Sequence, residues 1–466
     1  MTTFDRARTP TVARPPSVER LLAAARPRLG DRDHDAVVAV ARDVIAGERE
    51  RLTDGATVRS LDGLARDLID RLAAFDGPST SVDGSAAPPP RVINATGVLL
   101  HTNLGRASWP AAAIRAAAEA AASPSLLELD AATGRRGARS RAVEEHLIAL
   151  TGAQDALVTN NNAAALALAV GLAGRGGRVI VSRGELVEIG GGVRIPDIVR
   201  RAGARLVEVG TTNRTRVADF EAALVDGGAR VVLRVHPSNF VQSGFVETPD
   251  PAGVAEAAHR HGAIVVDDLG SGALLATETF GLAHEPTPRE RLAAGADLVT
   301  FSGDKLVGGP QAGLVVGRAD LITRLRRDPL ARAMRPDKVT TAAVAATLAL
   351  YRGGRAAREI PLWQMVATPL DALRARAEGL AGDRLEVAEM RSTLGGGSLP
   401  GETLPSWGIA VTSRSAERFA AGLRSGDRAV IARIEDGRVL LDLRTVPPAD
   451  DAALAVVLAR ALAALA

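Results

Sequence analysis

Two lysines stand out in this sequence, because the chain uses arginine for almost all of its positive charges. Of 57 basic residues, only Lys305 and Lys338 are lysine. An arginine readily replaces a lysine at a charged surface, but its guanidinium stays protonated and cannot form an imine with a carbonyl compound. The scarcity of lysine makes both residues candidates for amine chemistry. The residues around each lysine indicate whether it has a chemical role or is retained by chance.

Lys305 lies in the segment DLVTFSGDKLVGGPQAG (297–313), where an apolar run predicts a strand and four glycines follow. A lysine in a loop that lets the backbone approach closely suits an imine to pyridoxal phosphate, and the Ser302 hydroxyl is placed to hold the phosphate. The alternative is a surface lysine in a glycine-rich turn. Lys338 has two equally good interpretations: it lies in a basic cluster, or it is a solvent-exposed lysine at the start of a helix.

A pyridoxal phosphate site also needs a carboxylate at the ring nitrogen, to keep that nitrogen protonated. The segment AIVVDDLGSGAL places Asp267 and Asp268 at the end of a predicted buried strand. We favour Asp268, because Gly270 and Ser271 then follow where a small and a polar residue would lie against the ring. Asp267 remains possible, and a helix cap or turn would also explain an aspartate pair at a strand end.

The cofactor's phosphate needs hydrogen-bond donors, and the run TNNNAAA (159–165) joins a predicted strand to an alanine-rich helix. Backbone amides at a helix start form an anion site, and asparagine at the cap leaves them free to point at a phosphate. We therefore expect Asn161 and Asn162 to contact the cofactor, with simple helix capping as the alternative.

The composition excludes several other chemistries. The chain has no cysteine, so disulfides, thiolate metal sites, iron–sulfur clusters and cysteine nucleophiles are ruled out. The seven histidines show no metal-binding spacing, and we expect no metal site. No apolar run reaches the roughly 18 residues that cross a bilayer, and the first twenty residues lack the apolar stretch of an export signal. We expect a cytoplasmic protein without a membrane segment.

Four parts follow one another along the chain. Apolar residues at helical spacing predict a small helical domain over residues 1–75. Residues 76–90 are rich in proline, glycine and serine and predict a linker. Apolar runs alternate with helical patterns over residues 91–354, which predicts an α/β domain with a largely parallel sheet and a ligand site at its carboxyl edge. Residues 355–466 predict a smaller α+β domain.

These motifs resemble those of fold-type-I pyridoxal phosphate enzymes, and the chain is closely similar to the bacterial L-seryl-tRNA(Sec) selenium transferases. The likeness runs over nearly the whole chain and rests on the segments RVINATGVLLHTNLGRA, LVTNNNAAA, RGELVEIGGGVRIPDI, GTTNRT, HPSNF, VVDDLGSG, SGDKLVGGPQAG, RAMRPDK, PLWQM and GGGSLPGETLPS. It implies the fold-type-I α/β architecture, with a small helical N-terminal domain and an α+β C-terminal domain, and pyridoxal 5'-phosphate as cofactor.

The resemblance also implies roles for individual residues. Lys305 would be the imine lysine and Asp304 its acidic neighbour, while Arg106, Arg332 and Arg335 would bind the anionic group of the selenium donor, selenophosphate. Guanidinium groups suit such a donor, because they match phosphate oxygens in pairs. A chain without cysteine cannot carry a persulfide and must receive its selenium or sulfur from a small molecule.

By the same resemblance, the protein would convert seryl-tRNA(Sec) to selenocysteinyl-tRNA(Sec) by β-elimination to an aminoacrylyl-tRNA and addition of selenium. The N-terminal domain would hold the tRNA, and the chains would form a homo-oligomer, a ring of dimers of decamer size. Charge does not support the tRNA role, since residues 1–90 have a net charge of about −1. The alternatives are a related lyase or aldolase that acts on a small amino acid, and a tRNA-binding protein without activity.

Overall fold

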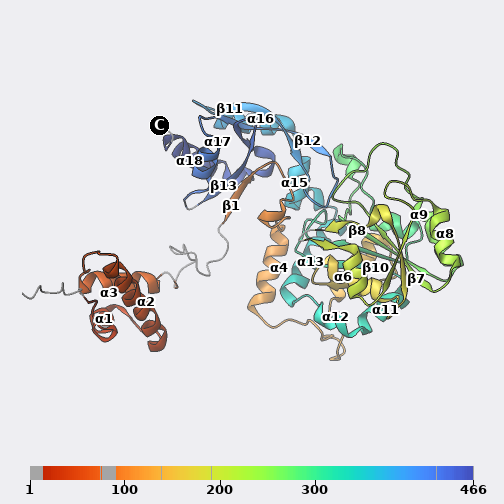
Figure 1. The fold of residues 1–466 in the computed structure, drawn as a ribbon, viewed down its shortest axis with the longest axis horizontal. Coiled ribbons are helices and arrows are strands. Elements are labelled where there is room, and N and C mark those ends of the chain that lie inside the picture. Colours follow the sequence, from red (N-terminus) through yellow and green to blue (C-terminus); the bar gives the residue numbers. More distant parts are fainter. Residues whose placement is uncertain are drawn as a thin grey trace, which may run out of the picture. The chain divides into compact units, whose positions relative to one another are not determined.

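The computed structural model describes residues 14–464, apart from 74, 76–90, 138, 190–191 and 427. The predicted linker, residues 76–90, lies outside the described residues. The chain divides into two compact units, Met1–Val92 with Gly426–Ala429 and Ile93–Ser425 with Val430–Ala466. Each unit has its own hydrophobic core and is described separately below (Figure 1).

The first unit contains three α-helices, α1 (Val18–Ala25), α2 (His34–Thr53) and α3 (Leu61–Ala73). The side chains of Ser17 and Asp33 accept hydrogen bonds from the first turns of α1 and α2, which fixes where these helices begin. The three helices bury one apolar face each in a common core, formed by Leu21, Ala25, Val37, Ala41, Val44, Ile45, Leu64, Ala65, Leu68 and Leu72.

Glu48 of α2 is a fully buried charge in this helical unit. Its carboxylate accepts hydrogen bonds from the backbone N and the Nε of Arg59, at 2.9 and 2.6 Å, and from Nη1 of Arg51 at 2.8 Å. Burial by itself raises the pKa of Glu48, but these hydrogen bonds outweigh it and lower the pKa to about 2. Part of the unit's positive charge is therefore used for internal pairing.

The second unit is built around a seven-stranded sheet in the order β2-β10-β9-β8-β7-β3-β6. Its strands are β2 (Asp155–Thr159), β3 (Arg178–Ser182), β6 (Arg205–Val209), β7 (Ala229–Val235), β8 (Ile264–Gly270), β9 (Leu298–Ser302) and β10 (Gly313–Gly317). The strands β6, β3, β7, β8 and β9 pair in parallel, and β10 runs antiparallel between β9 and β2. The predicted α/β fold with a mostly parallel sheet is confirmed.

Both faces of this sheet are buried. Along β9, Val299 and Phe301 belong to one hydrophobic core while Leu298 belongs to another, and the two cores lie on opposite faces. This explains why the strands read as continuous apolar runs instead of alternating patterns. Figure 1 shows the helices around the sheet. They are α4 (Ala111–Ala122), α5 (Arg141–Thr151), α6 (Asn162–Gly171), α7 (Ile195–Arg201), α8 (Val217–Val225), α9 (Pro251–Arg260), α10 (Pro288–Ala293), α11 (Ala319–Arg327), α12 (Pro329–Ala333), α13 (Lys338–Arg352), α14 (Ala356–Glu359) and α15 (Pro361–Ala367).

A second sheet, in the order β1-β13-β14-β12-β11, has its own core with three helices. Its strands are β1 (Val92–Ala95), β11 (Glu386–Thr393), β12 (Thr403–Thr412), β13 (Ala429–Glu435) and β14 (Arg438–Asp442), and its helices are α16 (Leu370–Leu380), α17 (Ala416–Arg424) and α18 (Asp451–Ala463).

The short strands β4 (Glu188–Ile189) and β5 (Val193–Arg194) form a hairpin. Short 3-10 turns lie at Arg26–Arg28, Thr102–Leu104, Arg183–Glu185, Thr277–Phe280, Leu443–Thr445 and Pro448–Asp450. No helix in the described part of the chain is long and apolar enough to span a membrane.

Candidate active site

A cavity of about 510 Å³ opens at the carboxyl edge of the seven-stranded sheet. Residues from the ends of β7, β8 and β9, from the start of α6 and from the loop before α4 line it. Seven of the residues singled out in the sequence lie in its wall, namely Arg106, Asn161, Asn162, Asp268, Ser302, Asp304 and Lys305. In open α/β sheets this edge is where ligands bind, so the cavity is the leading candidate for an active site.

Lys305 is partly buried in this wall, three residues beyond the end of β9. Burial lowers the pKa of its amine, and the positive charge of Arg106 lowers it further. A Cβ atom on Gly397 would overlap Lys305 Nζ and force the amine to move, and a Cβ on Gly270 would touch it at 3.6 Å. The fold thus holds an amine with a reduced proton affinity in a space kept clear of side chains.

Asp268 faces the same cavity from the end of β8. Its Oδ1 accepts hydrogen bonds from Asn162 Nδ2 at 2.7 Å and from Thr300 Oγ1 at 2.8 Å. Burial raises the pKa of Asp268, while these two hydrogen bonds act in the opposite direction. A carboxylate in such a place is stabilised by a positively charged partner, which a protonated ring nitrogen would provide.

Asp267 points away from the site. The described residues that line the cavity include Asp268 but not its neighbour, because successive side chains of a strand lie on opposite faces of the sheet. Asp267 Oδ2 instead lies 3.7 Å from Arg291 Nε, behind the cavity. The geometry therefore favours Asp268 over Asp267 as the partner of a bound ring.

The start of α6 forms another wall of the cavity. Asn161 caps this helix by accepting a hydrogen bond from Ala164 N at 2.9 Å, and Asn161, Asn162 and Ala163 all line the cavity. The first amides of a helix have no acceptor within the helix and carry its positive dipole end, so they suit a phosphate. Ser302, at the end of β9, lines the same cavity and can add its hydroxyl.

Asp304 and Arg106 form an ion pair beside Lys305. The Nη1 of Arg106 lies 2.7 Å from Asp304 Oδ2, and Arg106 has a φ of 61°, a left-handed conformation that non-glycine residues adopt uncommonly. Backbone strain of this kind is found where the surrounding structure fixes a side chain for function. The pair brings one guanidinium into the wall of the cavity while the neighbouring carboxylate partly balances its charge.

Arg332 and Arg335 do not lie among the described residues of the Lys305 cavity. They line a separate cavity of about 310 Å³ together with Arg139 and Arg326. Met334, between the two arginines, accepts a hydrogen bond from Asn160 N at 2.7 Å, so their segment is tied to the loop that precedes α6.

A single carboxylate balances several arginines near this second cavity. Glu128 lies 3.2 Å from Nη1 of Arg335, 2.9 Å from Nη1 of Arg139 and 2.6 Å from Nη2 of Arg136. Glu144 and Asp328 also line this cavity, so its four arginines face three carboxylates when Glu128 is counted, and a small excess of positive charge is left. Such a cluster suits an anionic ligand.

Sequence reasoning missed several residues of the site. His236, Ser238 and Gln311 line the Lys305 cavity, and Thr300 holds Asp268 from the neighbouring strand. A signal for His236 and Ser238 was present, because the polar run HPSN comes directly after an apolar run that forms a central strand. Strand ends next to β8 meet at the same edge of the sheet, so this run belongs to the site.

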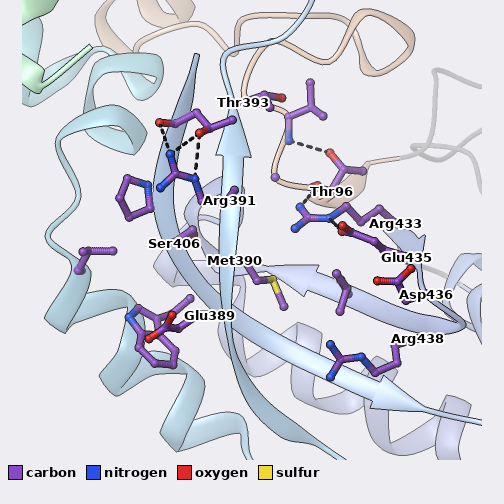
Figure 2. Close-up of a pocket in the computed structure, with 17 residues that line it drawn as sticks. Thr96, Glu389, Met390, Arg391, Thr393, Ser406, Arg433, Glu435, Asp436 and Arg438 are labelled. Carbon is purple, nitrogen blue, oxygen red and sulfur yellow. Dashed lines mark hydrogen bonds and ion pairs between the residues drawn. The ribbon is translucent and has the colours of Figure 1, made fainter. Parts of the chain in front are cut away.

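A larger cavity of about 710 Å³ lies in the second sheet (Figure 2). Its charged side chains are Arg391, Arg433, Arg438, Glu389, Glu435 and Asp436. Arg391 Nε donates to Thr403 Oγ1 at 2.9 Å, and Arg433 Nη1 donates to Thr96 O at 2.8 Å, so two of the arginines already have partners. The described residues of this wall contain neither a lysine nor an excess of one charge, and the chemistry belongs to the smaller cavity.

The residues of the Lys305 cavity fit pyridoxal phosphate. The cavity offers an amine for an imine, a carboxylate for the ring nitrogen, and a helix start with a serine hydroxyl for the phosphate. In addition, the buried Oδ1 of Asn162 receives no hydrogen bond from the described residues, so it can accept one from a ligand. Within the described ranges no group of three or more histidines and carboxylates is placed to hold a metal ion.

The fold and this site define a fold-type-I enzyme that depends on pyridoxal phosphate. Comparison with known proteins narrows the class. Residues 92–447 match the family model of L-seryl-tRNA selenium transferase. The chain belongs to this family.

Relatives match over nearly the whole chain. The L-seryl-tRNA(Sec) selenium transferase of Rhizobium meliloti (strain 1021) is 43% identical, over 92% of this chain and 93% of the relative. That of Moorella thermoacetica is 45% identical, over 96% of each chain. A solved structure of D-glucosaminate-6-phosphate ammonia-lyase superposes with a TM-score of 0.59 at 23% identity, covering 81% of this chain and 96% of that one, and so shares the fold.

Gly397 gives the first test of the site. In Gly397→Ala the new Cβ overlaps Lys305 Nζ, so we expect the amine to be displaced and its imine with pyridoxal phosphate to be weakened about tenfold or more, as overpacking costs about 1–3 kcal/mol. The measurement is the fraction of protein whose Lys305 is trapped with the cofactor by borohydride, read by peptide mass spectrometry.

Gly401→Ala is the matched control. Gly401 has a φ of 81°, close to the 87° of Gly397, but its Cβ would contact Val241 at 3.4 Å and not Lys305. Both variants therefore carry the cost of a side chain in the left-handed region, and only one meets the amine. Equal trapping in the two variants would mean that Gly397 has no special part in the site.

Proposed function

We propose that this protein converts L-seryl-tRNA(Sec) to L-selenocysteinyl-tRNA(Sec) with pyridoxal phosphate as cofactor and selenophosphate as selenium donor. One observation carries the proposal: a chain of the L-seryl-tRNA selenium transferase family brings Lys305 and Asp268 to one cavity. The relatives named above carry this activity in their names. The selenium donor is the finer part of the proposal and is argued separately below.

The residues of the cavity divide the work of a β-replacement. When bound, pyridoxal phosphate draws electrons from the amino acid attached to it, so that the Cα proton becomes acidic. Asp268 holds a positive charge at the ring nitrogen, and its own position is fixed by Asn162 and Thr300. The Lys305 amine, with its lowered pKa, is available as the neutral base that removes the Cα proton.

The replacement needs no nucleophile from the protein. Loss of the Cα proton and of the seryl hydroxyl leaves Cβ open to attack, and the selenium of selenophosphate bonds there while Lys305 returns the proton to Cα. Water then cleaves the Se–P bond, so that phosphate leaves and the selenol remains on the amino acid. This fits a chain in which no cysteine is present to carry selenium or sulfur. The start of α6 would hold the phosphate of the bound cofactor, which would keep the cofactor at a fixed place relative to Lys305.

Arginines are proposed to bind the selenium donor. Arg106 lies in the wall of the Lys305 cavity. Arg332 and Arg335 line the second cavity, and the residue between them, Met334, is hydrogen-bonded to the loop before α6. Guanidinium groups bind phosphate oxygens in pairs, which supports a phosphate-containing donor such as selenophosphate. The positive excess around Glu128 supports the same assignment.

Two partners are proposed beyond the small molecules. The helical unit formed by α1, α2 and α3 is proposed to hold the tRNA, which its separate core supports, because such a unit can be positioned on a large ligand independently. The chains are proposed to assemble as a homo-oligomer, a ring of dimers. Exposed apolar side chains at Phe240, Val241 and Phe245 support association.

The proposed function is tested by substrate choice. Wild-type protein with pyridoxal phosphate and selenophosphate should form selenocysteine on seryl-tRNA(Sec). The rate on ordinary seryl-tRNA should be lower by about a hundredfold or more. The measurement is selenium-75 incorporation into tRNA at equal concentrations of the two substrates. Incorporation without any preference, or none on either tRNA, would reject the proposal.

A shortened variant that begins at Arg91 separates tRNA recognition from chemistry. It should keep the cofactor trapped on Lys305, because the residues of that cavity all lie after position 100. It should lose the preference for tRNA(Sec). If the shortened protein binds tRNA(Sec) as tightly as the full chain does, the helical unit does not bind the tRNA.

The donor assignment is tested by Arg332→Ala. We expect the KM for selenophosphate to rise about tenfold or more, because a charge-assisted contact to phosphate is lost, while cofactor trapping and seryl-tRNA(Sec) binding stay unchanged. Arg324→Ala, on the exposed side of α11, is the control and should leave the KM as in the wild type. Loss of the cofactor in Arg332→Ala would instead give this arginine a structural or phosphate-holding role.

A further inference from the structure

A histidine and a glutamate form a pair in the wall of the Lys305 cavity, and the chemistry described so far uses neither. His236 follows β7 directly and is one of the residues that line the cavity. Its Nε2 lies 3.2 Å from Oε1 of Glu285, in the segment before α10. Glu285 is only 2% exposed, and the side chain of His236 is 19% exposed.

Both residues are held firmly by their backbones. His236 N donates to Asp268 O at 2.9 Å, which joins the end of β7 to β8 at the residue that faces the cavity. Glu285 N donates to Thr277 Oγ1 at 3.0 Å, and the same hydroxyl donates to Ala283 O at 2.6 Å. The imidazole and the carboxylate therefore face one another because of the fold and not through a chance arrangement of long side chains.

Glu285 presents a buried carboxylate to the ring of His236. Its Oε1 receives no hydrogen bond from the described residues, His236 included, although Nε2 of His236 lies 3.2 Å away. A buried carboxylate is stable only beside a cation or a donor, and an imidazolium is both.

The seryl hydroxyl leaves poorly as hydroxide and needs a proton. Lys305 takes the Cα proton and returns it to Cα when selenium adds, so a second group must supply the proton for the hydroxyl. The titratable groups in the described wall are already engaged: Asp268 by Asn162 and Thr300, Asp304 by Arg106, and Lys305 by the Cα proton. Glu188 also lines the cavity, but it is half exposed and paired with Arg194 at 2.8 Å. His236 is the remaining side chain of the described wall that can carry a proton and donate it.

We propose that His236, which lines the cavity and has Glu285 beside its ring, donates the proton that lets the seryl hydroxyl leave as water. The Cβ–O bond breaks, its electron pair goes to oxygen, and the imidazolium proton completes the water molecule. The Cα proton goes to Lys305, and the imidazole regains a proton from solvent before the next substrate. This inference rests on the proposed function, and it adds an acid to the base that Lys305 provides.

The test compares leaving groups that differ in their need for a proton. Seryl-tRNA(Sec) and β-chloroalanyl-tRNA(Sec) give the same product with selenophosphate, but chloride leaves without protonation. In single turnovers, His236→Gln should slow the seryl substrate about 100- to 10,000-fold and the chloro substrate less than about threefold. Cofactor trapped on Lys305 by borohydride and the Kd for seryl-tRNA(Sec) should both match the wild type, and these readouts do not depend on turnover.

Two further variants complete the test. Glu285→Gln should slow the seryl substrate about tenfold or more, less than His236→Gln does, and should leave the rate on the chloro substrate unchanged. This variant provides the test if His236→Gln does not fold. His284→Gln is the control, because His284 is adjacent in sequence to Glu285 but is exposed and paired with Glu278, so it should behave as wild type.

Other outcomes overturn the proposal. His236 is not the proton donor if His236→Gln slows both substrates equally, or slows neither. The same conclusion follows if the variant no longer traps the cofactor on Lys305. A wild-type protein that accepts neither tRNA substrate would instead reject the proposed function itself, so the two failures are distinguishable.

Discussion

The site depends on one constraint, the burial of the Asp268 carboxylate at the end of a central strand. A buried charge must be compensated, and the fold provides Asn162 from the start of α6 and Thr300 from β9 for this purpose. These two hydrogen bonds fix the helix that would hold a phosphate and the strand that leads to Lys305 relative to the same carboxylate. The hydrogen bonds that Asp268 accepts therefore set the distances between the phosphate site at α6, the carboxylate that faces the ring, and the Lys305 amine.

The second requirement is space around the amine. Gly270 and Gly397 approach Lys305 from two different segments, and a side chain on Gly397 would occupy the position of Nζ. Burial and the charge of Arg106 lower the pKa of this amine, so the surroundings that keep it accessible also keep it ready to act as a base. Asp304 limits the effect of Arg106 through its ion pair, which leaves the guanidinium in the wall without letting its full charge act on the lysine.

The sequence predicts those features that depend on local chemistry. Apolar runs at strand length predict the central strands, and the scarcity of lysine indicates Lys305, because each signal is contained in a short segment. Features that depend on which strands become neighbours escape this reasoning. The antiparallel β10, the hydrogen bond from Thr300 to Asp268 and the pairing of His236 with Glu285 join residues far apart in the chain. For the same reason spacing could not indicate that Arg332 and Arg335 line a cavity other than that of Lys305.

The central claim is that the Lys305 amine removes the Cα proton of serine carried by tRNA(Sec). It is tested most directly by incubating the enzyme in deuterated water without a selenium donor and measuring deuterium at Cα, or loss of the hydroxyl, by mass spectrometry of the tRNA-borne amino acid. We expect exchange or elimination on seryl-tRNA(Sec) with the wild type and none with Lys305→Arg, which keeps the charge but cannot act as a base. Absence of both in the wild type until selenophosphate is added, or an undiminished rate in Lys305→Arg, would contradict it.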